Sequence, residues 1–317
     1  MTKVLVVGGA GYIGGLSSDL LVQNGYDVTI FDILLYEPHY LKETSFVYGD
    51  IRNTDELVSV AERFDIIILL AALVGDPACS VDSELAEQIN YKAIMDFCTA
   101  LSPGKHVIFM STCSVYGAQD GLLTEENSTN PLSVYASTKL AAEKFVLQRG
   151  GTVFRLGTVF GLGDTYSRIR LDLVVNILTM KAVKTGEISV NGGGQWRPII
   201  SVIDIANFIL EACGKKPEGV FILSKENVTI RNLGERVAAV IPGTTIHYTE
   251  ISFQDARNYR VSTEKSEKYF TYRPKVTVED EVKRMLLVFK ENRIRDLDNI
   301  LYHNGQYLLK NINTLLK

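Results

Sequence analysis

A glycine-rich run near the N-terminus sets the tightest limit on the fold. It reads Gly8-Gly9-Ala10-Gly11-Tyr12-Ile13-Gly14, and it lies between an apolar run, Val4 to Val7, and a helical pattern from Tyr12 to Gln23. Its first, fourth and last residues are glycines that allow a tight turn, a close approach to a pyrophosphate and close packing of the helix on the strand. The start of the helix adds unpaired N–H groups and partial positive charge. The run therefore predicts a phosphate-binding turn between the first strand and the first helix.

Short apolar runs alternate with helical patterns along the first half of the chain. Strands are expected at residues 4–7, 28–31, 66–69, 107–110 and 152–154, and helices at 12–23, 55–62, 83–99 and 133–148. Runs that are apolar throughout are typical of parallel strands buried on both faces. The alternation predicts an α/β fold with a Rossmann-type doubly wound parallel sheet. Right-handed crossovers would bring the carboxyl ends of the strands, and hence the ligand, to one edge.

The second expected strand ends at Asp32, eighteen residues after Gly14. A carboxylate there can accept hydrogen bonds from ribose hydroxyls and would repel a 2′-phosphate. Residues 33–36 contain no Arg or Lys, which favours NAD over NADP as the cofactor. Asp50 could accept from the adenine amino group while Ile51 covers the ring, but Asp50 is equally consistent with a solvated turn.

Domain organisation follows the change in pattern after Gly161. We expect residues 1–165 to form the NAD-binding domain, with 199–224 returning to it. Residues 166–198 and 225–290 are expected to form a smaller C-terminal substrate-binding lobe. Residues 291–317, which are polar and rich in Tyr and Asn, are expected to be a tail that wraps the surface.

Tyr135 and Lys139 lie four residues apart, and therefore on one face of the expected helix. A free phenol has a pKa near ~10, and a nearby lysine favours the phenolate that a general base requires. The lysine can also hold the nicotinamide ribose. Thr112 follows a strand that ends at Met110, so its hydroxyl can reach the reacting oxygen at the ligand edge. The hydroxyl-rich run at residues 111–114 is also consistent with a simple helix-capping turn.

In combination these motifs resemble the extended short-chain dehydrogenase/reductases that modify nucleotide sugars, over residues 3–287. The shared motifs are the glycine run, Gly49-Asp50-Ile51, Leu70-Ala71-Ala72, Asn90, Ser111-Thr112 with Val115-Tyr116-Gly117, Tyr135 with Lys139, and residues 155–161. The resemblance implies a catalytic set of Thr112, Tyr135 and Lys139, with Tyr135 as acid/base. It implies NAD contacts from Gly8, Gly11, Tyr12, Ile13, Gly14, Asp32, Asp50, Ile51, Leu70, Ala71, Ala72, Asn90, Tyr135 and Lys139. It also implies a homodimer formed through helices 83–99 and 133–148.

The same resemblance implies a nucleotide-diphosphate sugar as substrate. Arg197 matches the arginine that binds the diphosphate, and guanidinium is a natural bidentate partner for phosphate oxygens. Arg257 lies in a second such element, where epimerases carry Arg-Pro-Gly-Asp. Because Ser252 stands at the position of their arginine, Arg257 either replaces it or is a surface residue. Arg168 and Arg170 are expected at the mouth of the site. The residues expected at the substrate are Val74, Thr112, Cys113, Ser114, Thr158, Arg170, Arg197 and Arg257.

The reaction that the resemblance implies begins with proton removal by Tyr135 and hydride transfer to NAD+, which gives a keto sugar. Dehydratases of the family carry an Asp-Glu pair after the catalytic Thr, whereas this chain has Cys113 and Ser114. This difference disfavours 4,6-dehydration. Epimerisation at C4 and net 4-oxidation or 4-ketoreduction remain, with 4,6-dehydration and 4-ketoreduction as the alternatives to epimerisation and oxidation. Local strings at 70–75, 170–176 and 257–259 resemble a branch that includes a GDP-heptose 4-dehydrogenase. A non-catalytic dinucleotide sensor and a small-molecule dehydrogenase are the alternatives, but neither requires the full set of motifs.

Net charge and composition indicate which partners are not expected. The net charge of −4 does not favour nucleic acid or an anionic membrane, and no apolar run reaches the ~18 residues of a spanning helix. The four cysteines show no CxxC spacing and no neighbouring histidine, so no metal site is expected. Met1-Thr2-Lys3 leads directly into a strand, which leaves no room for a signal peptide, and a cytoplasmic protein is expected.

Overall fold

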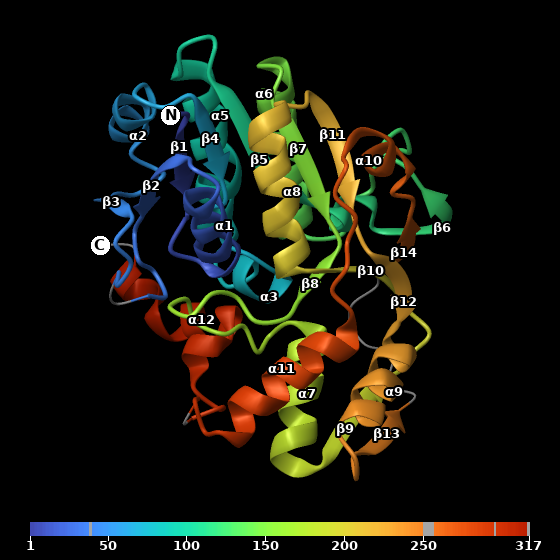
Figure 1. The fold of residues 1–317 in the computed structure, drawn as a ribbon. Helices are drawn as coiled ribbons and strands as arrows, with labels where there is room; N and C mark the ends of the chain where they lie inside the picture. The colour runs from blue at the N-terminus through green and yellow to red at the C-terminus, as the bar shows by residue number, and fades with distance from the viewer. Residues whose placement is uncertain (38–39, 250–256, 295, 316–317) are drawn as a thin grey trace.

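The computed structural model describes residues 1–37, 40–249, 257–294 and 296–315. Within these residues a seven-stranded parallel sheet runs in the order β11-β7-β5-β4-β1-β2-β3 (Figure 1). Its strands are β1 (Lys3–Val7), β2 (Asp27–Asp32), β3 (Ser45–Tyr48), β4 (Ile66–Leu69), β5 (His106–Thr112), β7 (Thr152–Leu156) and β11 (Gly219–Leu223). All apolar residues of β1 and β4 are buried, as expected for central parallel strands, and only Lys3 at the start of β1 is exposed. The predicted doubly wound α/β fold is confirmed.

Helices cover both faces of this sheet because successive strand residues point to opposite sides. Val4 and Val6 pack in one hydrophobic cluster with residues of α1 (Tyr12–Gln23) and α8 (Val202–Lys215). Leu5 and Val7 pack in another cluster on the opposite face. That second face is covered by α2 (Thr54–Ala61), α5 (Ala93–Ala100) and α6 (Val134–Gln148). The single helix expected at 83–99 is divided into α4 (Ser83–Glu87), a π-helical turn η1 (Gln88–Lys92) and α5.

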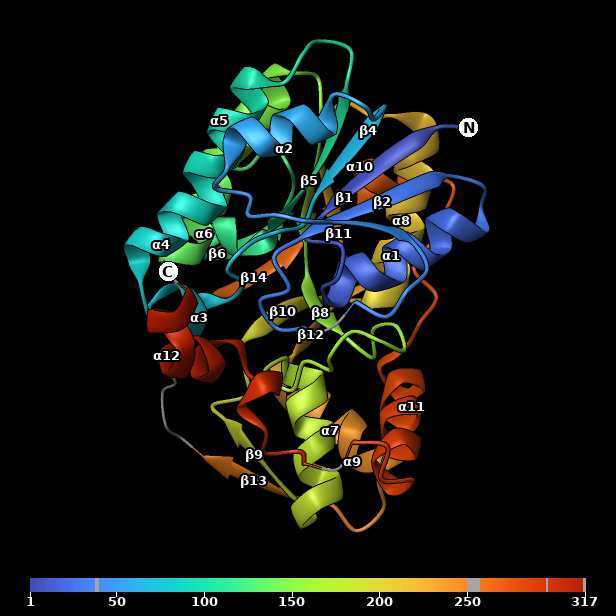
Figure 2. The ribbon, with the colours of Figure 1, turned by 90° about the vertical axis from the view of Figure 1, so that its left-hand side faces the viewer.

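A second body lies beyond the carboxyl ends of the strands (Figure 2). Its sheets pair β12 (Glu226–Thr229) with β10 (Trp196–Ser201) and β8 (Thr158–Phe160), and β13 (Thr245–Thr249) with β9 (Glu187–Asn191). Its main helices are α7 (Val174–Thr185), α9 (Ile230–Val240) and α11 (Val278–Lys290). These helices share a hydrophobic core of their own, so this lobe is packed independently of the large sheet. A further pair, β6 (Ala118–Leu123) with β14 (Asn258–Val261), flanks the junction.

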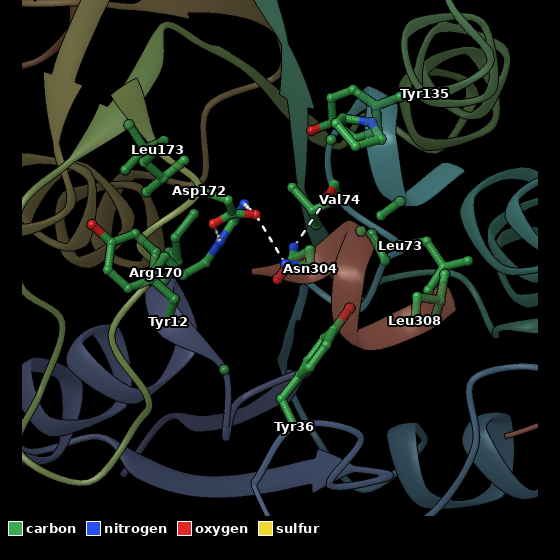
Figure 3. A pocket seen from close by; sticks show the side chains of 18 of the residues that line it. Tyr12, Tyr36, Leu73, Val74, Tyr135, Arg170, Asp172, Leu173, Asn304 and Leu308 are labelled. Carbon is green, nitrogen blue, oxygen red and sulfur yellow. Dashed lines mark hydrogen bonds and ion pairs between the residues drawn. The ribbon is translucent and has the colours of Figure 1, made fainter. Parts of the chain in front are cut away.

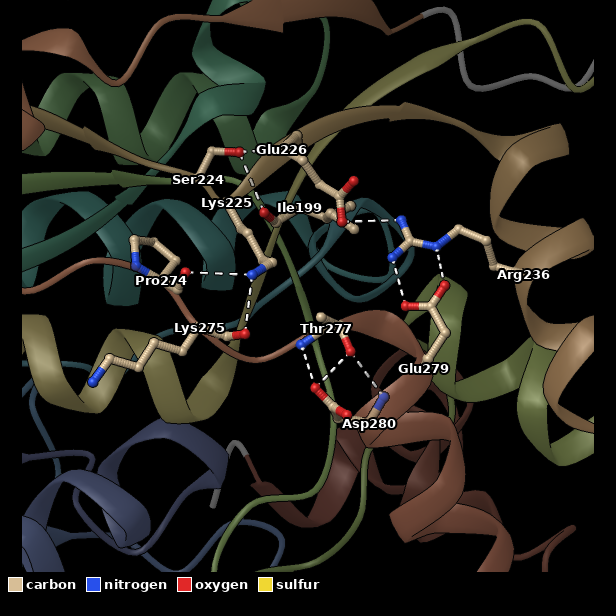
Figure 4. Close-up of polar contacts among 10 residues, drawn as sticks. All are labelled: Ile199, Ser224, Lys225, Glu226, Arg236, Pro274, Lys275, Thr277, Glu279 and Asp280. Atoms are coloured by element: carbon tan, nitrogen blue, oxygen red, sulfur yellow. Dashed lines mark hydrogen bonds and ion pairs between the residues drawn. The ribbon is translucent and has the colours of Figure 1, made fainter.

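Polar contacts fix α11 onto this lobe (Figure 4). Arg236 of α9 pairs with Glu279 of α11 at 2.6 Å and with Glu226 of β12 at 2.9 Å. Thr277 and Asp280 form a capping box that begins α11. These contacts join three elements that are distant in the sequence and hold the wall of the lobe in place.

The C-terminal segment differs from the expected surface tail. It forms the short turn η3 (Ile300–Tyr302) and ends in α12 (Asn304–Leu315). The helix α10 (Glu264–Tyr269) precedes α11 in the chain. The helix α12 lies against α3 (Asp76–Cys79), close to the junction of the two bodies (Figures 1 and 2). Leu308 is fully buried there, so this segment is part of the packed structure. In the part of the chain that is described, no helix has the length and apolar character needed to cross a bilayer.

Candidate active site

A cavity of about 1490 Å³ opens where the carboxyl ends of the strands meet the smaller lobe. It is lined by the turns after β1, β2, β4 and β5, by the start of α6, by the segment before α7 and by α12. This is the edge at which ligands bind to doubly wound sheets. The volume is large enough for two ligands side by side, since a single small-molecule site occupies ~300–1,000 Å³.

The glycine turn lies at the floor of this cavity. Gly8 has φ +83°, and a Cβ atom there would lie 2.4 Å from the backbone nitrogen of Ala71. A Cβ atom on Gly14 would lie 2.5 Å from the carbonyl oxygen of Gly8. Both positions therefore require glycine. The Tyr12 hydroxyl donates to the carbonyl oxygen of Gly161 at 2.6 Å, which ties the turn to the chain that enters the smaller lobe.

Asp32 lines the cavity at the end of β2. Its carboxylate accepts the N–H groups of Ala10 at 3.0 Å and Leu34 at 2.8 Å. Burial raises the pKa of Asp32, and these N–H groups oppose the rise. Asp50 and Ile51 also line the cavity, but the Asp50 carboxylate is already engaged by the Arg52 side chain at 2.5 Å. Asp32 is thus the better placed of the two acids to receive a ribose.

The turn after β4 contributes Leu70, Ala71, Ala72 and Val74 to the cavity wall. Asn90, which was expected near the cofactor, is not among the described lining residues. Its side-chain amide accepts from the backbone nitrogen of Leu73 at 2.8 Å and donates to the Leu73 carbonyl at 2.9 Å. Both polar groups of the amide are used in this way, so Asn90 supports the turn from behind.

Thr112, Tyr135 and Lys139 all line the cavity. The Thr112 hydroxyl accepts the N–H of Ser114 at 3.1 Å, which caps the short turn η2 (Cys113–Tyr116). Thr112 therefore does act as a capping residue. Its hydroxyl accepts in that contact and still has its own proton to donate to a ligand. Burial raises the pKa of Tyr135, with Cys79 adding to the rise. Burial lowers the pKa of Lys139 to about 7, against the influence of Cys79 and Glu143.

A buried ionic network lies beneath these three residues, and the sequence analysis missed it. Glu143 accepts from Ser111 Oγ at 2.5 Å and from both Nε and an Nη atom of Arg155, the latter at 2.7 Å. Arg155 also donates to the Tyr116 hydroxyl at 2.8 Å. The network joins α6, β5 and β7 directly behind Thr112 and Lys139. Its members come from three separate elements, so no local spacing in the sequence indicated it.

The two residues after Thr112 differ in whether they face the cavity. Ser114 lines the cavity, and its hydroxyl accepts from the Arg257 guanidinium at 3.1 Å. Cys113 was expected at the substrate, but it is fully buried, and within the described chain it is not a lining residue. Its thiol donates to the Arg155 carbonyl at 3.2 Å, and burial raises its pKa. Direct substrate contact by Cys113 is therefore not supported.

Arginines surround the part of the cavity next to the smaller lobe. Arg197 is only 6% exposed and donates to the carbonyl oxygens of Trp196 at 2.8 Å and Arg257 at 2.5 Å. Arg257 also pairs with Asp76 at 3.2 Å, so it lies in the cavity wall. Arg170 makes a bidentate contact with Asp172, at 2.9 Å for each nitrogen. Thr158 lines the cavity as well, whereas Ser252 lies outside the described residues.

In the described part of the chain, no group of three or more His, Cys, Asp or Glu side chains could hold a metal ion. Among the described residues, the charged side chains that line the cavity are five carboxylates, five arginines and two lysines, Lys139 and Lys181.

Comparison with known proteins bears on the cofactor. The model of the NAD dependent epimerase/dehydratase family matches residues 4–223. The chain belongs to this family. Its cofactor is therefore NAD, in agreement with the place of Asp32, and the chain is an enzyme of the epimerase/dehydratase type.

Individual relatives support the same assignment. A UDP-glucose 4-epimerase of Lactobacillus helveticus is 31% identical over 156 residues, but this match spans 45% of the chain and 46% of that protein. A putative UDP-glucose 4-epimerase of Methanocaldococcus jannaschii is 26% identical over 91% of the chain and 99% of its own length. The solved UDP-glucose 4-epimerase of Thermotoga maritima with UDP-glucose has a TM-score of 0.77 at 24% identity, covering 92% of the chain and 100% of that structure. This last likeness concerns the fold.

Proposed function

We propose that the protein is an NAD(H)-dependent oxidoreductase or epimerase that acts at C4 of a nucleotide-diphosphate sugar. The observation that carries the proposal is one cavity that holds Thr112, Tyr135 and Lys139 together with Arg197 and Arg257. The first group is suited to alcohol–ketone chemistry, and the arginines are suited to a diphosphate. The named activities of the relatives, UDP-glucose 4-epimerases, agree with this division.

In the proposed mechanism Tyr135 takes the proton of the C4 hydroxyl while Thr112 donates a hydrogen bond to the same oxygen. A bound NAD+ would supply the hydride acceptor and a positive charge beside the phenol. The ammonium of Lys139 would hold the nicotinamide ribose and stabilise the phenolate. Burial, with smaller contributions from Cys79 and Asp76, raises the pKa of Tyr135, so the phenolate would depend on nearby positive charge. Arg170 and Arg257 already act in that direction, and Lys139 and NAD+ would add to it. The product of this half-reaction is a 4-keto sugar.

The outcome after the keto sugar depends on what lies around C5. Position 113 carries a thiol, which is buried behind the wall, and position 114 carries a hydroxyl bound to Arg257, so the two positions do not supply the carboxylate pair of the dehydratases. Two outcomes are then open to the keto sugar. Return of the hydride to the other face of C4 would complete an epimerisation, and release of the keto sugar would complete a net oxidation. The 4,6-dehydratase and the 4-ketoreductase are the alternative reactions.

The test is incubation of the purified protein with NAD+ and a panel of UDP-, dTDP- and GDP-sugars. Accumulation of NADH would indicate net oxidation, and inversion at C4 without NADH would indicate epimerisation. Loss of water from the sugar would point to the dehydratase. Binding of NAD with no reaction on any nucleotide sugar would overturn the proposal in favour of a dinucleotide sensor.

The arrangement of the two bodies supports a division of labour, which we also propose. Residues 1–165 with 199–224 would hold NAD, and residues 166–198 with 225–290 would hold the sugar nucleotide. The sheets divide slightly differently, since β8 and the last residues of β10, Ile199–Ser201, pair in the three-stranded sheet with β12 and not in the seven-stranded sheet.

A homodimer through the helices at 83–99 and 133–148 is part of the same proposal. Tyr91, Met95 and Phe145 are half-buried apolar residues on these helices, and the rings of Tyr91 and Phe145 lie 6.1 Å apart. A second copy packed on this face would cover them. Light scattering of the purified chain should give a mass near twice 35.2 kDa, and Phe145→Glu should shift it towards the monomer.

A further inference from the structure

The C-terminal segment reaches the cavity, although nothing in its composition indicated a ligand. His303, Asn304, Tyr307 and Leu308 all line the same cavity as Asp32 and Tyr135. The family match ends at residue 223, well before this segment. The segment therefore adds a wall to a site whose other walls belong to the family fold.

One residue fastens the segment to both bodies of the molecule. Asn304 is 4% exposed, and its side-chain nitrogen donates to the carbonyl of Val74, at the turn after β4, at 3.1 Å. Its side-chain oxygen accepts from the Arg168 guanidinium, and its backbone N–H donates to Asp172 at 3.2 Å. Figure 3 shows Asn304 between Val74 and the Arg170–Asp172 pair. Asn304 is thus the link between the large sheet and the segment that precedes α7.

Apolar contacts seal the next turn of α12. Leu308 is fully buried in a cluster with Leu73, Cys79 and Leu85, against which Tyr135 and Leu35 also pack. The Tyr307 ring lies 5.2 Å from the ring of Tyr36, which follows β2. The segment therefore spans from the turn beside Asp32 to the neighbourhood of Tyr135, which is the span of a dinucleotide bound along the strand ends.

We propose that residues 303–309 are a functional part of the NAD site: they close over the bound dinucleotide, with Asn304 as the fastening residue, and slow its release. The segment is a binding and positioning element and supplies no reacting group. Release of the dinucleotide requires the segment to leave both Val74 and the Leu73 cluster, so the opening of this segment sets the dissociation rate.

The test is the dissociation rate of NADH from the full-length protein, followed by stopped-flow fluorescence. Leu308→Asp places a charge in an apolar cluster, and Gly305→Val places a side chain where even a Cβ atom would lie 2.9 Å from Pro77. The two changes displace α12 by independent means. Each should raise the dissociation rate by roughly tenfold or more, because local opening no longer limits release. Lys310→Ala, at an exposed position of the same helix, should leave the rate unchanged.

Three further readouts separate this proposal from general damage. Hydrogen exchange should show loss of protection in α12 alone, and circular dichroism should show an intact fold. The pH profile of turnover of Gly305→Val should stay that of the wild type, because this change adds no charge near Tyr135. If both variants expose α12 to exchange and NADH still dissociates at the wild-type rate, the segment does not retain the cofactor.

Discussion

The two halves of the cavity are built in different ways. On the half beside β1 and β2 the glycine turn presents backbone groups, and Asp32 is the acid best placed for a ribose. On the half beside the smaller lobe, side chains from separate segments converge, and Arg170, Arg197 and Arg257 carry the charge. Ligand binding in the first half would depend on the backbone conformation of the glycine turn. Ligand binding in the second half would depend on arginine side chains from segments that are distant in the sequence.

Because of this difference, we expect the two halves to differ in how selectively they bind their ligands. A helix N-terminus receives a phosphate through N–H groups and a dipole that any sequence with the same backbone would provide. Arginines held by neighbours such as Asp76 and Asp172 act at fixed places and can distinguish one sugar nucleotide from another. We therefore expect cofactor and substrate binding to respond independently to mutation. The predictions below test that independence.

The largest effect is expected where the two halves meet, at Tyr135. Tyr135→Phe removes the ionisable oxygen and keeps the ring packed, so turnover should fall by ~10²–10⁴-fold through loss of acid/base assistance. The affinity for NAD should change little, as measured by titration. Tyr269→Phe is the matched control, since Tyr269 is exposed on α10 and does not line the cavity in the described structure. Wild-type turnover of Tyr135→Phe on a confirmed substrate would remove Tyr135 from the mechanism.

The sheet and the cofactor half could be predicted because their signals are local. A glycine turn between a strand and a helix, followed by an acid at the end of the next strand, is complete within residues 4–32, and the sheet confirms the predicted fold class. The helix that carries Tyr135 and Lys139, and the place of Thr112 at the end of β5, were predicted in the same way, from spacing along one element.

The errors arose where a partner comes from a distant segment. Cys113 lies between two cavity residues in sequence, but the turn η2 directs its thiol to the Arg155 carbonyl. The side-chain amide of Asn90 is hydrogen-bonded to the backbone of Leu73. The role of Asn304 depends on Val74, 230 residues away, so no local pattern could have placed α12 in the cavity.

The second largest effect is expected at Arg197, in the substrate half. Arg197→Ala should raise the KM for the sugar nucleotide by ~30–150-fold, the equivalent of about 2–3 kcal/mol for a lost charge-assisted bidentate contact. The affinity for NAD should stay unchanged. Arg260→Ala provides the control, since Arg260 is exposed on the neighbouring β14 and does not line the cavity in the described structure. An equal loss of NAD binding in Arg197→Ala would contradict the independence of the two halves.

A smaller effect is expected at Asp32, in the cofactor half. The wild type should bind NAD far more tightly than NADP, and Asp32→Ala should narrow the gap by roughly tenfold through loss of hydrogen bonds to a charged acceptor. The sugar-nucleotide KM, measured at saturating NAD, should not move. Asp27→Ala, at the opposite end of β2, is the control. Equal affinities of the wild type for the two cofactors would refute the role of Asp32.

The smallest effect is expected from salt, and it compares the halves without mutation. Raising the ionic strength from about 0.05 to 0.5 M shortens the screening length, which weakens attraction between a diphosphate and nearby guanidinium groups. The KM for the sugar nucleotide should therefore rise by roughly a few fold. The Kd for NAD should rise less, because its pyrophosphate meets N–H groups of the glycine turn, which carry only partial charge. Arg197→Ala should flatten the salt dependence of KM, whereas Asp32→Ala should leave that slope in place. A steeper salt dependence for NAD than for the sugar nucleotide would mean that formal charge also dominates the cofactor half, and the contrast between the two halves would fail.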